Sequence, residues 1–192
     1  MMKHIKGVVF DLDGTLVSCD LCFQKMREVI GCPREEDILT FVASLDDKAQ
    51  TIANRKIKDL ELADAHAATW IDGAKQFIKL LASYSIPMAI ITRNSREASL
   101  IKKNNNQIPI ERIISREDAP AKPDPTALIS LAEEWQLAPN TLLYIGDYLY
   151  DIEIARNAGV QSALFCEHGK PEYAKDADYV FECYKDFASL FE

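Results

Sequence analysis

Two aspartates directly follow a short apolar segment near the start of the chain, and this arrangement constrains the fold most. Residues 8–10 are Val, Val and Phe, which favour a strand buried on both faces of a parallel sheet. Asp11 and Asp13 are two residues apart, so both side chains point to the same side of an extended chain. In an open α/β sheet the carboxyl ends of the strands face the ligand crevice, where both carboxylates are expected. Buried charges need a partner, so a compensating positive charge is expected there too.

Strand-like and helix-like segments alternate along most of the chain, which indicates a parallel sheet covered by helices. Helices are expected to begin near Asp72 and Ser95 and at Thr126, Tyr150 and Lys185. The expected strands are at residues 8–10, 86–92, 112–114, 140–145, 162–165 and 179–181. The predicted fold class is therefore α/β, with a doubly wound, mostly parallel, Rossmann-like sheet.

The segment between the first two expected strands has a helical pattern instead. One helix is expected from a cap at Asp20 through Ile30, a second has Pro33 as its first residue, and a third spans about 46–69. Because this insert leaves the sheet after its first strand and returns before its second, it is expected to cover the carboxyl edge as a cap. The predicted domains are an α/β core of residues 1–16 and 70–192 and a small helical cap of residues 17–69.

Composition and charge narrow the function. The 192 residues are 48% hydrophobic, which suits one substantial core with a small inserted domain. The net charge is −8, and no run of Lys or Arg forms a stripe that would neutralise a phosphate backbone, so nucleic acid is not an expected partner. The apolar runs have the length of strands, and neither a signal peptide nor a membrane span is apparent. These features predict a cytoplasmic protein without a membrane partner.

The five cysteines form no disulfide framework, which favours reduced thiols. Cys19 and Cys22 are spaced like a metal-binding or redox pair, and Cys32 and His66 are the candidates for further metal ligands. No second pair with this spacing accompanies them, so we interpret them as incidental thiols. A metal or redox role for Cys19 and Cys22 stays open.

Four polar segments follow the expected strands or lie in the loops behind them. They are Asp11-x-Asp13-Gly14-Thr15, Ile91-Thr92-Arg93-Asn94, Lys122-Pro123-Asp124-Pro125 and Gly146-Asp147-x-x-x-Asp151. In this order they resemble the four motifs of the haloacid dehalogenase-like (HAD) hydrolases, over nearly the whole chain outside the insert. A helical insert between the first two motifs is similar to the cap of the phosphoglycolate phosphatase branch, although it is shorter than the usual cap there.

The resemblance implies a hydrolase acting on phosphoric monoesters through an aspartyl-phosphate intermediate. Asp11 would be the nucleophile, and Asp13 would be the general acid and afterwards the general base. Lys122 would supply positive charge to the transition state, and Thr92 would donate its hydroxyl to the phosphoryl group. The implied catalytic residues are Asp11, Asp13, Thr92 and Lys122, and the implied phosphate- and substrate-binding residues are Thr92, Arg93, Asn94 and Lys122.

The resemblance also implies Mg²⁺ as cofactor. Its ligands would be Asp11, Asp147 and the main-chain carbonyl of Asp13, with Asp151 acting through water or by orienting Lys122. Independently, carboxylates gathered at one crevice repel each other unless a cation lies among them. A simpler interpretation makes Asp147 a helix cap and Asp151 a first-turn acid, each stabilising the helix by about 0.5–1 kcal/mol. Both interpretations can hold together.

The residues leave alternatives open. A sugar phosphomutase shares every motif, whereas a phosphate-accepting signalling module would place its acceptor on a mid-chain strand. A catalytically idle interaction protein is disfavoured because no motif residue is missing. The expected partner is a small phosphorylated metabolite, and the chain is expected to be a monomer or a homodimer. If the metabolite carries a second anionic group besides its phosphate, that group would meet basic residues of the cap or core edge. The candidates are Lys25, Arg27, Lys48, Arg55 and Arg93.

Overall fold

A six-stranded parallel sheet forms the centre of the molecule, with the strand order β3-β2-β1-β4-β5-β6. The structure is a computed structural model that describes residues 2–21 and 23–192. The strands are β1 (Gly7–Phe10), β2 (Met88–Ile91), β3 (Arg112–Ile114), β4 (Leu142–Gly146), β5 (Gln161–Phe165) and β6 (Tyr179–Phe181). The predicted α/β class with a parallel sheet is confirmed. Because β1 pairs with both β2 and β4, Asp11 follows a strand from the middle of the sheet.

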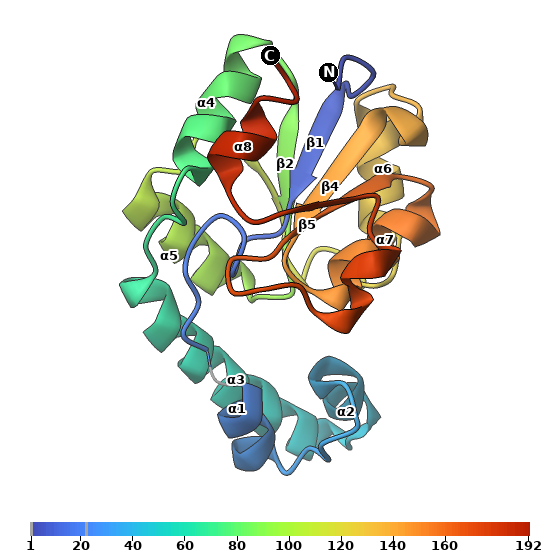
Figure 1. The fold of residues 1–192 in the computed structure, drawn as a ribbon. Helices are drawn as coiled ribbons and strands as arrows, with labels where there is room; N and C mark the ends of the chain where they lie inside the picture. Colours follow the sequence, from blue (N-terminus) through green and yellow to red (C-terminus); the bar gives the residue numbers. More distant parts are fainter. Residues whose placement is uncertain (1, 22) are drawn as a thin grey trace.

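Helices cover both faces of this sheet (Figure 1). α4 (Ala74–Ser83) and α8 (Tyr184–Ala188) pack on one face, while α6 (Thr126–Glu134) and α7 (Leu149–Ala158) pack on the other. α5 (Arg96–Asn106) follows β2, and short 3-10 helices occupy Pro139–Thr141 and Glu172–Asp176. The period of two along β1 divides its side chains between the faces, since Val8 and Phe10 join the α4 side and Val9 the α6 side.

The α4 side of the core is built around one aromatic ring. Phe77 is 1% exposed, and its ring centre lies 5.6 Å from that of Tyr184 and 5.3 Å from that of Phe191. We expect Phe77→Ala to lower the free energy of unfolding by about 3–5 kcal/mol, because the cavity adds to the lost burial. Urea denaturation measures this change. Phe23→Ala is the control, since Phe23 is 62% exposed; an equal loss in both variants would contradict the packing described.

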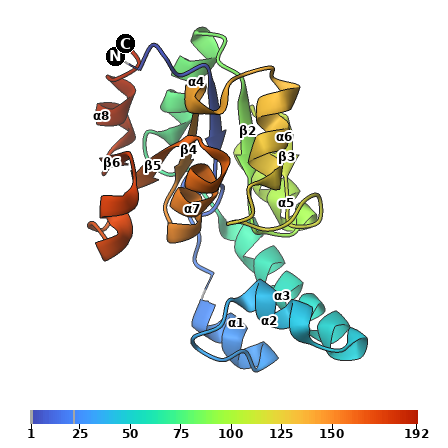
Figure 2. The ribbon, with the colours of Figure 1, turned by 90° about the vertical axis from the view of Figure 1, so that its right-hand side faces the viewer.

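Three helices lie beyond the carboxyl ends of the strands, whereas both chain ends lie at the opposite end (Figures 1 and 2). They are α1 (Phe23–Ile30), α2 (Ile38–Ser44) and α3 (Asp47–Ala67). These helices bury an apolar cluster of their own, which includes Met26, Ile38 and Ile57. We call residues 17–69 the insert.

The two connections between the insert and the sheet run side by side. The amide of Ser18 donates to the carbonyl of Thr69 at 2.7 Å, and the amide of Ile71 donates to the carbonyl of Leu16 at 3.0 Å. The chain therefore enters and leaves the insert at one place.

Two expected helix starts were wrong. α2 begins at Ile38 instead of Pro33, because the Asp37 side chain accepts from the Thr40 amide at 3.0 Å and caps the helix there. α4 begins after Gly73, whose φ of 77° is left-handed, so Asp72 is not its cap. α1 begins at Phe23, and the Asp20 amide donates to the Asp64 side chain at 2.8 Å. Residue 22, directly before this helix, lies outside the described residues, so a cap at Asp20 stays a prediction.

Candidate active site

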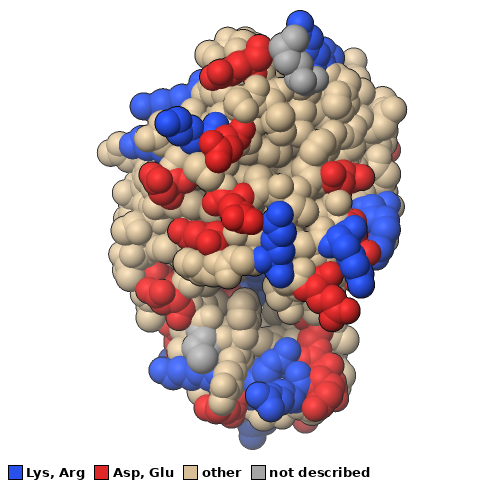
Figure 3. Space-filling view, viewed as in Figure 1, with Lys and Arg blue, Asp and Glu red and all other residues tan. Residues whose placement is uncertain are grey.

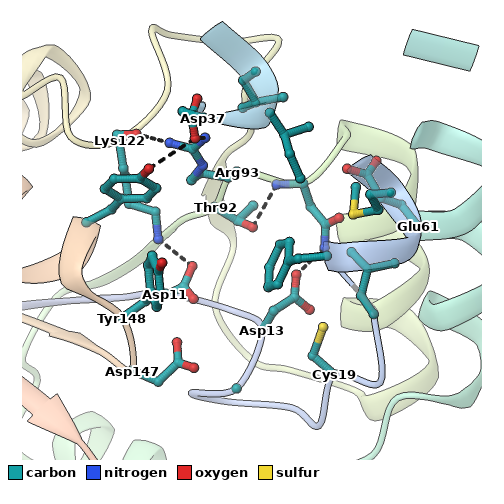
Figure 4. A pocket seen from close by; sticks show the side chains of 18 of the residues that line it. Asp11, Asp13, Cys19, Asp37, Glu61, Thr92, Arg93, Lys122, Asp147 and Tyr148 are labelled. Carbon is teal, nitrogen blue, oxygen red and sulfur yellow. Dashed lines mark hydrogen bonds and ion pairs between the residues drawn. The ribbon is translucent and has the colours of Figure 1, made fainter. Parts of the chain in front are cut away.

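Side chains that follow three neighbouring strands meet at the carboxyl edge of the sheet (Figure 4). Asp11 directly follows β1, Thr92 directly follows β2 and Asp147 directly follows β4. Together with the insert they line a cavity of about 310 Å³. The structure thus brings together residues from the first, second and fourth polar segments, as the sequence predicted.

Lys122, from the third segment, joins two of the acids. Its Nζ lies 2.6 Å from Asp11 Oδ1 and 2.6 Å from Asp151 Oδ1, and all three side chains are buried. Burial opposes the charged form, yet the charges of Asp11 and Asp151 hold the pKa of Lys122 well above its ordinary value. The ammonium is therefore a fixed positive charge beside Asp11, and Asp151 orients it.

Carboxylate oxygens of Asp11, Asp147 and Asp151 lie within 4.8 Å of one another. Burial raises the pKa of Asp11 to about 7, and the charge of Asp151 acts in the same direction against that of Lys122. Burial and the charge of Asp11 also raise the pKa of Asp147 well above its ordinary value. Three carboxylates that share one ammonium would carry two uncompensated negative charges, so this arrangement lacks positive charge.

Two glycines make room for these carboxylates. Gly14 has a φ of 72°, and a Cβ there would collide with the Asp147 carboxylate. A Cβ on Gly146 would likewise collide with the Asp151 side chain. The residues fit a divalent cation, because the oxygen donors and the excess negative charge are those that Mg²⁺ accepts. The cluster contains the side chains of three of the four predicted metal residues.

The Asp13 side chain belongs to a different group. Its carboxylate accepts hydrogen bonds from the Lys102 ammonium and from the side-chain amide of Asn94. Lys102 Nζ also lies 2.5 Å from Asp64 Oδ2. Figure 4 shows Asp13 next to Cys19, between Asp11 on one side and Glu61 on the other. Burial raises the pKa of Asp13 although Lys102 opposes this. A metal contact through its main-chain carbonyl stays a prediction.

The second segment places its three polar residues in three different directions. Thr92 is buried, and its hydroxyl accepts a hydrogen bond from the main-chain amide of Asn94 at 3.1 Å. Arg93 turns to the insert, where its Nη2 lies 2.5 Å from Asp37 Oδ2, and it also donates to the Lys122 carbonyl. The guanidinium lies 4.5 Å from the ring centre of Tyr150. The Asn94 side chain reaches Asp13, whereas Arg93 links this segment to Asp37, the cap residue of α2.

Sequence reasoning missed the partners that hold these groups. Lys102 is 0% exposed in the middle of α5, and no local pattern marks it. Glu61 of α3 is also buried, where it pairs with Arg116 and accepts from the Ser95 amide at 3.2 Å. Glu61 shares the buried face of α3 with Ala53, Ile57 and Ala65. Its partners lie more than thirty residues away along the chain, so no local pattern identifies them.

The simpler interpretation of the fourth segment was half right. Tyr148, not Asp147, is the N-cap of α7, so the predicted cap at Asp147 is wrong. Asp151 does stabilise this helix start, since its Oδ2 accepts from the amides of Asp147 at 3.1 Å and Tyr148 at 3.0 Å. Its other oxygen accepts from Lys122. Asp151 therefore stabilises the start of α7 and also contacts Lys122 in the carboxylate cluster.

Cys22 lies outside the described residues, so the pair with Cys19 is not tested. Cys19 itself is a free thiol, and burial raises its pKa to about 12. It lies close to Asp13 and Asp64, which both pair with Lys102. Neither Cys32 nor His66 joins a metal-type cluster in the described part of the chain.

Two further findings concern the charge of the surface and the length of the helices. Acidic and basic side chains are interspersed on the face drawn in Figure 3, without a continuous basic stripe. Among the described residues, none of the helices has both the length and the apolar character to cross a membrane.

The comparisons with known proteins now decide the family. The sequence model of one protein family, described as haloacid dehalogenase-like hydrolase, matches residues 20–165, well over half of the chain. The chain belongs to the haloacid dehalogenase-like hydrolases. The predicted membership of this family is thereby confirmed, and the chain is an enzyme of the HAD-like phosphatase class.

Relatives agree with this membership of the HAD hydrolases. A phosphoglycolate phosphatase of Thiobacillus denitrificans is 31% identical, over 92% of this chain and 91% of the relative. A HAD-like hydrolase domain-containing protein of Arabidopsis thaliana is 30% identical, over 87% of this chain and 73% of the relative. The crystal structure of a hydrolase from Pseudomonas syringae covers 97% of each chain with a TM-score of 0.82 at 19% identity, which shows the shared fold. The phosphoglycolate phosphatase-like branch is confirmed as well.

Proposed function

We propose that this HAD hydrolase is a Mg²⁺-dependent phosphatase that releases phosphate from a small phosphomonoester through an aspartyl-phosphate intermediate. One observation carries the proposal: Asp11, 7% exposed, borders the cavity with Lys122 Nζ 2.6 Å from its Oδ1. A carboxylate held beside a fixed cation, at the floor of a pocket, is placed to attack an electrophilic phosphorus and not merely to stabilise the fold.

In the first half of the reaction, an oxygen of Asp11 attacks phosphorus and the bond from phosphorus to the alcohol oxygen breaks. Asp13 gives its proton to that departing oxygen, so the alcohol leaves neutral. Burial favours the uncharged form of Asp13, although its contact with the Lys102 ammonium opposes this. Lys122 and the Thr92 hydroxyl, which both border the cavity, stabilise the charge on the transferring phosphoryl group.

In the second half, Asp13 takes a proton from water as the water oxygen attacks phosphorus. The bond from phosphorus to Asp11 then breaks, which restores the carboxylate and releases phosphate. Asp11, Asp147 and Asp151 would hold Mg²⁺, with the Asp13 carbonyl as the further predicted ligand. When bound, the cation supplies Lewis-acid neutralisation of the phosphoryl charge.

The insert is assigned as a cap domain in this proposal, with residues 1–16 and 70–192 as the catalytic core. Its position over the carboxyl edge and its own apolar cluster support this division. The partner is a small phosphorylated metabolite, as the phosphatase relatives suggest. A cytoplasmic location fits the free thiols of Cys19, Cys32, Cys166 and Cys183.

Phosphate release from a panel of phosphomonoesters, with and without metal, tests the proposal. We expect turnover with Mg²⁺ and its loss in excess EDTA, because the carboxylate cluster otherwise lacks positive charge. Asp147→Asn should raise the Mg²⁺ concentration needed for half-maximal rate by at least about 10–100-fold, the loss found when a group that supports a metal ligand is altered. Full activity in EDTA would contradict the proposal. Transfer of phosphate between positions of a sugar, without release, would instead indicate the phosphomutase alternative.

A further inference from the structure

We propose that the substrate of this phosphatase carries an uncharged, largely apolar leaving group with no second anionic group. The inference rests on the proposed function and concerns the part of the cavity that the insert forms. It replaces the expectation that basic residues of the cap or core edge meet a second anion.

The first argument is that Arg93 is already occupied. Its guanidinium is paired with Asp37 at 2.5 Å, donates to the Lys122 carbonyl and stacks on Tyr150. Asp37 is held in turn, since its carboxylate accepts from the Tyr150 hydroxyl at 3.2 Å and from the Thr40 amide at 3.0 Å. Although burial opposes it, the Thr40 hydrogen bond and the charge of Arg93 lower the pKa of Asp37, so the pair is ionised.

The other basic side chains at the cavity are occupied too. Among the described residues that line it, the remaining ones are Arg27 and Lys122. Arg27 donates to the Pro33 carbonyl at 2.9 Å and to the Glu36 carbonyl, both in the loop before α2. Lys122 pairs with Asp11 and Asp151 at the phosphoryl end. The other candidates from the sequence, which are Lys25, Lys48 and Arg55, do not line the cavity.

The second argument is the character of the opposite wall. The side chains that the insert contributes to the cavity are mainly apolar: Leu21, Phe23, Met26, Ile38, Leu39 and Ile57. Phe23 is 62% exposed, so it has apolar surface available to a ligand. The carboxylate of Glu61, also in this lining, is neutralised by Arg116. A leaving group therefore meets hydrocarbon, the ion pairs of Arg93 and Glu61, and Arg27, whose Nη1 is hydrogen-bonded to two main-chain carbonyls. Burial of apolar surface against this wall is favourable.

Electrostatics and size lead to the same class of substrate. A second carboxylate or phosphate would lie against hydrocarbon without a partner, would have to draw Arg27 away from the Pro33 and Glu36 carbonyls, or would have to displace Asp37 from Arg93. The cavity of about 310 Å³ is at the lower end of ligand pockets, which span about 300–1,000 Å³. This favours a phosphoryl group with a compact organic substituent.

The test compares isobutyl phosphate with 2-phosphoglycolate. Both are alkyl esters of the same shape, but two methyl groups of the first replace the two carboxylate oxygens of the second. We expect kcat/KM to be at least about tenfold higher for isobutyl phosphate, within the range of about 10–200-fold that apolar pockets achieve. A preference for 2-phosphoglycolate in the unmodified protein would overturn the inference while the phosphatase proposal stands.

A substitution at the ion pair makes the test specific. Asp37→Asn should keep the cap of α2, since Asn is a good N-cap, but removes the charge that occupies Arg93. We expect the preference for isobutyl phosphate to fall by at least about tenfold, as pairing with a released guanidinium is gained. Asp46→Asn is the matched control, because Asp46 caps α3 away from the cavity. An unchanged preference in Asp37→Asn would contradict the role given to this pair.

Binding separates the inference from the proposed reaction. Calorimetry of Asp11→Asn with Mg²⁺ measures affinity for both esters without depending on turnover. Tighter binding of isobutyl phosphate would support the substrate class even if no ester were hydrolysed, in which case only the phosphatase proposal fails. Equal or weaker binding of isobutyl phosphate would overturn the inference.

Discussion

Asp11→Asn is expected to reduce phosphate release by about 10⁴-fold or more, because an amide is a poor nucleophile and the covalent route is lost. The loss should appear in kcat with every ester, since the residue acts on phosphorus and not on the leaving group. No phosphoryl adduct should be found by intact-protein mass spectrometry after rapid mixing with substrate. Residual activity within about tenfold of the unmodified enzyme would rule out Asp11 as the nucleophile.

Folding has to be separated from chemistry in this variant. The raised pKa of Asp11 shows that its buried charge is unfavourable, so a neutral side chain of the same shape should not destabilise the fold strongly. A thermal unfolding midpoint close to that of the unmodified protein is therefore expected. Asp59→Asn, an exposed change on α3, is the matched control and should retain full activity.

Asp13→Asn should slow turnover by about 10²–10⁴-fold, the usual effect of losing a general acid and base. The variant keeps an oxygen that can accept from Lys102, so the arrangement around α5 should persist. With an alkyl ester, formation of the phosphoenzyme should be slow, because nothing protonates the leaving oxygen. With nitrophenyl phosphate, formation should survive while hydrolysis lags, and phosphoaspartate should accumulate at Asp11.

Rapid mixing of Asp13→Asn with nitrophenyl phosphate, followed by intact-protein mass spectrometry and peptide mapping, measures this accumulation. Asn94→Ala is a useful comparison, because Asn94 contacts Asp13 without being an acid. It should lower the rate less and should not trap the intermediate. Near-normal turnover of Asp13→Asn on both kinds of ester would refute the acid and base role.

The sheet and its acidic edge were predictable because their signals are local. An apolar segment that runs into Asp11 defines the central strand, and the strands around it repeat the same pattern. The spacing of Asp147 and Asp151 likewise follows from one helix turn after β4. For these residues, neighbours in the sequence largely determine position in space.

The contacts between the insert and the core were not predictable in this way. Asp37 was expected inside a helix, but it caps α2 and pairs with Arg93, which is 56 residues away in the chain. Lys102 looks like an ordinary helix lysine, yet Asp13 and Asp64 bury it completely. The pairs that involve Asp37 and Asp64 depend on how the insert docks, and the pair of Lys102 with Asp13 depends on how α5 packs against the core. Both are set by tertiary packing between distant segments.

The adjacent entry and exit of the insert have an evolutionary consequence. Because Ser18 and Thr69 are hydrogen-bonded neighbours, the insert interrupts the core no more than a hairpin loop would. Residues can be added, deleted or exchanged between these points without altering the register of β1 with β2 and β4. A lineage can therefore vary the wall around the leaving group while it inherits the phosphoryl chemistry unchanged, so that selectivity and reactivity diverge at separate rates.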